Sequence, residues 1–408
     1  MDERQSRRNI LAAAAAGGIG FTGFTLVMPF LPLYIAELGT TDVGEIAMWT
    51  GLTLGATPTV TAISAPLWGR VGDKYGSKLL VIRSLTAFIL TKAGMAFVTA
   101  PWQLFALRAL LGVFAGYGAL TMSMAAQSAP RDRMAHAIGL VQTGHRLGPA
   151  IGPVIGGVLA PLVGLRSAFL VAACFYAAAM LLIIVVYQEP PKRAAAAKAR
   201  GGWEVFSQLM RLPGFLLALL VIFGLQTVDR SFGPVLPLFV QQVGVDGPRI
   251  AFVAGVLFSL GAISAAAGSQ LGPRLLTRYS AKTILVAGTL TASLALAAIV
   301  AAPSVWVLGV AIVIAGTAMG AGTTTIYSVA GGLLPADAHA TGFGIMTTAS
   351  LMGLAVSPVV AGFIGAAGLR IVFVADVVLL LVLALLIGAR LRSQRTGTDS
   401  EDAVLADP

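Results

Sequence analysis

Long apolar runs alternate with short polar breaks along the whole chain. A helix needs about 20 predominantly apolar residues to cross the roughly 30 Å of hydrocarbon in a bilayer. Twelve runs are long enough, and we expect one membrane-spanning helix in each: residues 10–36, 45–68, 79–99, 102–128, 135–161, 166–187, 213–242, 248–272, 282–302, 304–333, 340–366 and 370–390. The pattern predicts an all-α membrane protein.

The composition supports a membrane protein and excludes several other classes. Hydrophobic residues make up 57% of the 408 residues and charged residues only 11%, whereas soluble domains carry about 25% charged residues. The single cysteine, Cys174, and three histidines are too few for a disulfide framework or a zinc site of the usual kind. We therefore expect no metal and no cofactor.

The basic residues predict the orientation of the chain in the membrane. Nineteen of the 27 lysines and arginines fall on one side of the predicted spans, and only Arg166, Arg249 and Arg370 fall in loops on the other side. Because basic residues concentrate in cytoplasmic loops, both termini are expected in the cytoplasm. The net charge of +10 follows from this topology and requires no nucleic-acid partner.

The chain divides near its middle into two similar halves. The segment MPFLPLY at residues 28–34 recurs as GPVLPLF at 233–239, an offset of 205 residues. Internal duplication is typical of transporters whose binding site lies between the two halves. We predict a six-helix bundle at 1–187, a cytoplasmic linker at 188–211, a second six-helix bundle at 212–393 and a cytoplasmic tail at 394–408.

The linker contains one candidate element. Trp203, Phe206, Leu209 and Met210 share one face of a helix, which predicts a short amphipathic helix on the inner leaflet. An early start of the seventh span is the alternative.

Three motifs narrow the class of transporter. The loop GRVGDKYGSK at 69–78 combines glycines with one carboxylate among basic residues. Asp73 lies where it can cap the next helix or pair across the seam between the halves. Span four contains Arg108, a cation that normally lies in the protein interior or a wet cavity, although snorkelling toward the outer interface is the alternative. Span five carries a run of spaced glycines: Gly139, Gly148, Gly152, Pro153, Gly156 and Gly157.

These motifs resemble those of the major facilitator superfamily, specifically its twelve-span drug:proton antiporters, over residues 10 to 390. The resemblance implies two pseudo-symmetric six-helix bundles in the cytoplasmic membrane, acting as a monomer. It implies export of a small hydrophobic compound, with the proton gradient as the energy source, and therefore antibiotic resistance. In the family, the loop motif latches the cytoplasmic gate, which assigns that role to Gly69, Arg70, Asp73, Gly76 and Lys78. The span-five motif indicates antiport, and Arg108 is assigned a part in proton transfer.

Two other functions stay open at this point. A carrier for a sugar or another metabolite would share the same architecture. A membrane-embedded enzyme is a remote alternative, because it needs a cluster of chemically active side chains. The chain has only three histidines and no paired carboxylates within the predicted spans.

Few residues within the spans can carry a proton. Asp229 lies near the centre of span seven and is the main candidate, although a permanent structural ion pair is the alternative. Apart from Arg230, the span around it is uncharged, from residue 212 to 228 and from 231 to 245. Arg230 is expected to pair with another helix, or with Asp229 through water, because consecutive helical residues do not face each other. Asp376 is expected to be structural, and Lys92 peripheral or structural. The remaining candidates for proton coupling in span five are His145 and Arg146.

Aromatic and methionine side chains are expected to line the substrate cavity. In the family, spans one, four, seven and ten surround the cavity, and such side chains form adaptable apolar walls. The alternative for each is contact with lipid or with the helix core. The candidates are Phe21, Phe24, Met28, Phe114, Tyr117, Gln226, Phe232, Met319 and Tyr327.

Overall fold

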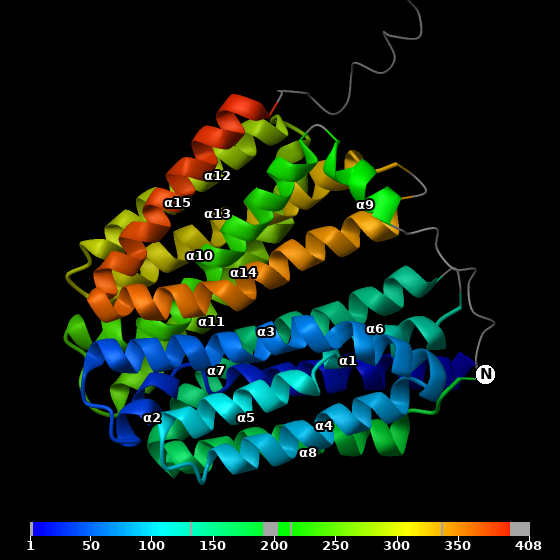
Figure 1. Ribbon diagram of the computed structural model, residues 1–408, viewed down its shortest axis with the longest axis horizontal. Helices are drawn as coiled ribbons and strands as arrows, with labels where there is room; N and C mark the ends of the chain where they lie inside the picture. The colour runs from blue at the N-terminus through cyan, green and yellow to red at the C-terminus, as the bar shows by residue number, and fades with distance from the viewer. Residues whose placement is uncertain (1–2, 131–132, 191–202, 213, 336–337, 392–408) are drawn as a thin grey trace, which may run out of the picture. The chain divides into compact units, whose positions relative to one another are not determined.

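The computed structural model describes residues 3–130, 133–190, 203–212, 214–335 and 338–391 (Figure 1). These residues form fifteen α-helices, and the described part of the chain contains no strand. Nine stretches of it are long and apolar enough to cross a membrane. The prediction of an all-helical membrane protein is confirmed, whereas the count of twelve spans and the orientation of the termini stay predictions.

The helices follow the predicted spans with two interruptions in the first half. The elements of this half are α1 (Glu3–Thr25), α2 (Leu31–Glu37), α3 (Val43–Tyr75), α4 (Ser77–Met95), α5 (Pro101–Val113), α6 (Tyr117–Ser128), α7 (Met134–Val163) and α8 (Leu165–Val186). The predicted first span is thus divided between α1 and α2, and the fourth between α5 and α6. Helix α1 packs against α6, α7 and α8, and α4 packs against α5 and α8 (Figure 1).

The second half contains one short helix and six long ones. Its elements are α9 (Trp203–Met210), α10 (Phe215–Gln242), α11 (Arg249–Leu276), α12 (Ala281–Val300), α13 (Val305–Gly332), α14 (His339–Ala367) and α15 (Leu369–Arg390). Helix α9 is separate from α10, so the short helix in the linker is favoured over an early start of span seven.

The repeated proline segment folds differently in the two halves. In the first copy, residues 26–30 form a turn between α1 and α2, since Pro29 lacks the N–H that would continue the helix. In the second copy, Pro234 and Pro237 lie inside the continuous helix α10. Sequence similarity between the halves therefore does not extend to identical backbone geometry.

The chain forms two compact units whose limits cut through several helices. Unit 1 comprises Met1–Ala197, Phe232–Ser259 and Pro358–Leu369, and unit 2 comprises Lys198–Ser231, Leu260–Ser357 and Arg370–Pro408. Close backbone contacts explain why parts of α11 and α14 belong to unit 1. A Cβ atom on Gly255 would collide with the carbonyl of Pro153 on α7, and one on Gly51 of α3 would collide with the carbonyl of Pro358 on α14.

Candidate functional site

Three glycines of the span-five motif form the surface of α7 that contacts α1. A Cβ atom on Gly156 would collide with the carbonyl of Leu26, and one on Gly152 with the hydroxyl of Thr25. The Thr25 hydroxyl donates a hydrogen bond of 3.0 Å to the carbonyl of Gly148. Because any side chain would separate the backbones, these glycines are required for the close approach of the two helices.

The remaining motif residues do not share this surface. Gly157 faces α11 instead, where a Cβ would lie 2.6 Å from the carbonyl of Ala251. Gly139 has open space, with no atom within 4 Å of a built Cβ. Pro153 lies inside α7. The motif therefore combines one tight contact with α1, a second contact with α11 and one unconstrained glycine.

His145 belongs to an aromatic cluster between α1, α6 and α7. Its Nε2 atom lies 3.0 Å from the hydroxyl of Thr121, and its ring centroid lies 4.6 Å from that of Phe21. The Tyr117 hydroxyl donates to the carbonyl of Ala16 on α1. Two of the predicted cavity residues, Phe21 and Tyr117, thus lie beside the histidine within unit 1. Arg146, the next residue along α7, is exposed.

Two cations lie in the interior of unit 1. Arg108 of α5 is 1% exposed and Lys92 of α4 is 0% exposed. The Arg108 guanidinium lies 5.8 Å from the ring centroid of Phe24, another predicted cavity residue. Burial of Arg108 excludes snorkelling toward the outer interface, and burial of Lys92 leaves the interior position of the two alternatives, peripheral or structural, that the sequence offered.

The break between α5 and α6 leaves backbone carbonyls without helical partners. Gly116 has a φ angle of 111°, a conformation that side chains other than glycine rarely adopt. The indole N–H of Trp68 donates to the carbonyl of Val113 at 2.6 Å, and Nη2 of Arg83 donates to that of Phe114 at 3.0 Å. No pattern in the sequence indicated this role for Trp68 and Arg83.

The Arg83 guanidinium also stacks on an aromatic side chain. Its central carbon lies 3.4 Å from the ring centroid of Trp68 and 5.7 Å from that of Phe114. Arg83 therefore stabilises the break between α5 and α6 through a charged hydrogen bond and a cation–π contact. Phe114, a predicted cavity residue, takes part in these structural contacts.

The turn between α3 and α4 is stabilised by Glu189, which lies in the predicted cytoplasmic linker. Gly76 has a φ angle of 90°, and Glu189 accepts hydrogen bonds from the backbone N–H of Ser77 at 2.7 Å and of Lys78 at 3.3 Å. Glu189 thus caps α4. Lys78 donates to the carbonyl of Tyr187 at 2.6 Å.

Three other residues of the predicted gate motif lie in α3. Gly69, Arg70 and Asp73 belong to α3, but their side chains lie outside the described residues. The gate role of the loop stays a prediction.

The two acidic residues within the spans of unit 2 differ in environment. Asp229 is 46% exposed, and its carboxylate lies 3.0 Å from Nε of Arg230. The expectation that these neighbours do not meet directly is wrong, because the long Arg230 side chain folds back onto the preceding residue. Asp376 is 5% exposed and accepts a hydrogen bond of 2.5 Å from the hydroxyl of Ser231.

The five other predicted cavity residues are divided between the two units. Met28 lies in the turn after α1, and Phe232 lies in the part of α10 that belongs to unit 1. Gln226, Met319 and Tyr327 belong to unit 2. Met319 is buried, whereas the side chains of the other four are half-buried.

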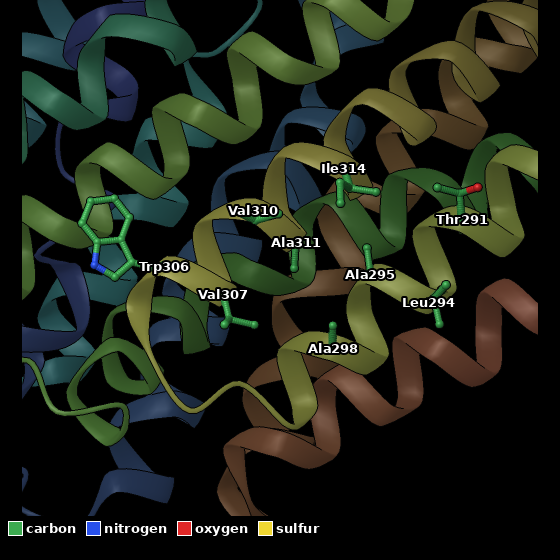
Figure 2. A pocket seen from close by; sticks show the side chains of 9 residues that line it. All are labelled: Thr291, Leu294, Ala295, Ala298, Trp306, Val307, Val310, Ala311 and Ile314. Carbon is green, nitrogen blue, oxygen red and sulfur yellow. The ribbon is translucent and has the colours of Figure 1, made fainter.

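A groove of about 420 Å³ lies between α12 and α13 in unit 2 (Figure 2). Apart from Thr291 it is lined by apolar residues, and Trp306 lies at one end. Trp306 is 86% exposed and Leu294 is 75% exposed. None of the predicted site residues lines the groove, and its apolar walls are those expected of a surface in contact with lipid.

Comparisons with known proteins agree with this architecture. The model of the Major Facilitator Superfamily matches residues 13–300 and 228–405. The chain is 31% identical to multidrug resistance protein MdtG of Proteus mirabilis (strain HI4320) over 65% of this chain and 66% of that protein. It is 28% identical to the multi-drug resistance efflux pump PmrA homolog of Lactococcus lactis subsp. lactis (strain IL1403) over 84% of this chain and 85% of that protein.

A solved structure shows the same fold. The crystal structure of a bacterial homolog of the human lysosomal transporter Spinster, in an inward-facing and occupied conformation, superposes with a TM-score of 0.78. It covers 95% of this chain and 97% of that chain at 18% sequence identity.

Proposed function

Because the chain belongs to the major facilitator superfamily, we propose that it exports small hydrophobic or amphipathic compounds in exchange for protons. The names of the similar bacterial proteins support a drug as the substrate. We further propose twelve spans, cytoplasmic termini and a place in the cytoplasmic membrane. Substrate, protons and lipid are then the partners of the chain.

The observation that carries the proposal is the glycine surface of α7. Gly148, Gly152 and Gly156 occupy the positions of the antiporter motif, and they lie against α1 without room for a side chain. In a transporter that alternates between two open states, such a surface permits helices to approach closely. Because this motif indicates antiport in the family, its presence supports export by antiport over uptake.

Asp229 is the proposed proton carrier in unit 2. Its carboxylate is 46% exposed and has one cation, Arg230, at 3.0 Å. Loss of that contact or of hydration would raise the proton affinity of the carboxylate, and their return would lower it. A cycle then follows in which substrate binds while Asp229 is ionised, and protonation from outside releases it. A membrane potential of 100 mV contributes about 2.3 kcal/mol for each charge moved.

Gradient-driven uptake of ethidium into inverted vesicles tests the proposal. The native chain should accumulate ethidium when the vesicle interior is acid, and Asp229→Asn should abolish the dependence on the gradient. Asp246→Asn removes a carboxylate from an exposed loop and is the matched control. A native chain that ignores the gradient contradicts proton-coupled export, whereas an Asp229→Asn variant with native behaviour contradicts only the role of Asp229.

A further inference from the structure

A second group that can exchange a proton lies inside unit 1. Lys92 lies within α4 and is 0% exposed. Its amine has no hydrogen-bond partner among the described residues. The nearest aromatic contact is the ring of Phe169, with the amine 5.7 Å from its centroid. A lysine ammonium has three donors, so a charged Lys92 would leave all three unpaired in the protein interior.

A second buried cation lies in the same interior as Lys92. Arg108 on α5 is close enough to repel it electrostatically, and Nε and Nη2 of Arg108 also lack hydrogen-bond partners in the described chain. On α8, the buried hydroxyl of Tyr176 has no partner either. The site therefore gathers Lys92, Arg108 and Tyr176 from three helices, and among these side chains only the neutral Tyr176 hydroxyl can accept a hydrogen bond.

The other charged and titratable groups around α4 do not neutralise the site. On α6, Tyr117 donates to the carbonyl of Ala16. Arg166 of α8 binds the carbonyls of Ala96 and Val98 at the end of α4, each at 3.2 Å. The carboxyl side chains described in unit 1 all lie in loops or terminal turns: Glu3, Glu37, Asp42, Glu45, Glu189 and Asp246.

Two adjacent buried cations without a counter-charge cannot both keep their charge at low energetic cost. An arginine guanidinium stays protonated in proteins, whereas a buried lysine readily gives up its proton. We propose that Lys92 is a proton-carrying group of the transporter, neutral when it is buried beside Arg108 and protonated when helix movement separates the two. This proposal rests on the proton-coupled export proposed above.

The fold provides a means to change the distance between the two cations. Arg108 lies on α5, and α5 ends at the break before Gly116, whereas Lys92 lies on the uninterrupted helix α4. Movement of α5 relative to α4 would relieve the repulsion, so that the amine takes up a proton from water on one side. The reverse movement would return that proton to water on the other side. The cycle transfers one proton and consumes no other reactant.

The protonation state of Lys92 can be measured without any transport. In purified protein labelled with ¹⁵N-lysine, the Nζ signal that disappears in Lys92→Met reports this residue. We expect a neutral-amine signal at pH 7 that becomes an ammonium signal as the pH falls. An ammonium signal at pH 7 and above would overturn the proposal.

Transport in proteoliposomes then tests the role of the proton. Lys92→Met cannot bind a proton and Lys92→Arg cannot release one, so both should keep ethidium–ethidium exchange but lose accumulation driven by a pH gradient. Lys282→Met, at the start of α12, is the control and should keep both activities. A native chain without gradient-driven accumulation overturns the proposed function itself. If the native chain accumulates ethidium and Lys92→Met does so equally, only the role of Lys92 is overturned.

Discussion

Alanine substitutions at two glycines of the span-five motif should have opposite effects on stability. Both glycines lie in the same helix, α7, so alanine contributes the same gain in helix propensity at each, about 1 kcal/mol. At Gly139 nothing lies within 4 Å of the added methyl group, and the gain is expected in full. At Gly156 the methyl group collides with the backbone of α1 at Leu26, which cannot rotate away as a side chain would.

The collision at Gly156 sets the size of the expected difference. Overpacking in a well-packed interior costs about 1–3 kcal/mol, and a backbone obstacle places Gly156→Ala at the upper end. Because the propensity term cancels between the variants, Gly156→Ala should be less stable than Gly139→Ala by about 3 kcal/mol. Thermal unfolding of the purified proteins in one detergent measures the difference. Equal melting temperatures, or a less stable Gly139→Ala, would refute the close packing of α1 on α7.

Two further substitutions test contacts that the sequence did not reveal. Arg83→Lys keeps the charge but loses the planar stack on Trp68 and the hydrogen bond to the Phe114 carbonyl, so it should destabilise the protein by about 2 kcal/mol. The control Arg133→Lys, at an exposed ion pair, should change stability by under about 0.5 kcal/mol. Equal effects of the two variants in a thermal unfolding assay would contradict a stabilising role of Arg83 at the break between α5 and α6. Asp376→Asn keeps an acceptor for Ser231, so both its melting temperature and its gradient-driven transport should match those of the native chain. Loss of gradient dependence in that variant would show that Asp376 carries a proton rather than a structural hydrogen bond.

The fold class could be predicted from hydrophobic length alone, and part of the glycine surface from spacing. Positions 148, 152 and 156 are four residues apart and therefore share one face of a helix. Gly139 precedes Gly148 by nine residues, which corresponds to about two and a half turns and places it on the opposite face. The lack of contact at Gly139 is thus explained by periodicity, although the motif includes it.

Three features could not be predicted in this way: the burial of Lys92, the cap of α4 and the break between α5 and α6. Lys92 lies in a run that is apolar on every side, so periodicity does not reveal which face is buried. Glu189 caps α4 across more than a hundred residues of chain, and no local pattern connects the two segments. The break at Gly116 lies in a stretch without proline, where an uninterrupted span was the natural expectation.

The pair formed by Asp229 and Arg230 shows a different limit. Helical geometry places consecutive Cβ atoms about 100° apart, which argues against a direct contact. The long arginine side chain nevertheless reaches the preceding carboxylate through Nε, at 3.0 Å. Helical periodicity predicts the direction of each Cα–Cβ bond, but it does not predict the position of the charged group at the end of a flexible side chain.

Coupling between drug and proton movement is the most direct test of the proposed function. Proteoliposomes containing the native chain are loaded with ethidium and a pH-sensitive dye, then diluted into ethidium-free buffer with no initial pH difference. Antiport predicts that the interior becomes acid as ethidium leaves through the protein, since protons enter in exchange. Ethidium efflux through the protein with an unchanged or more alkaline interior would contradict proton antiport.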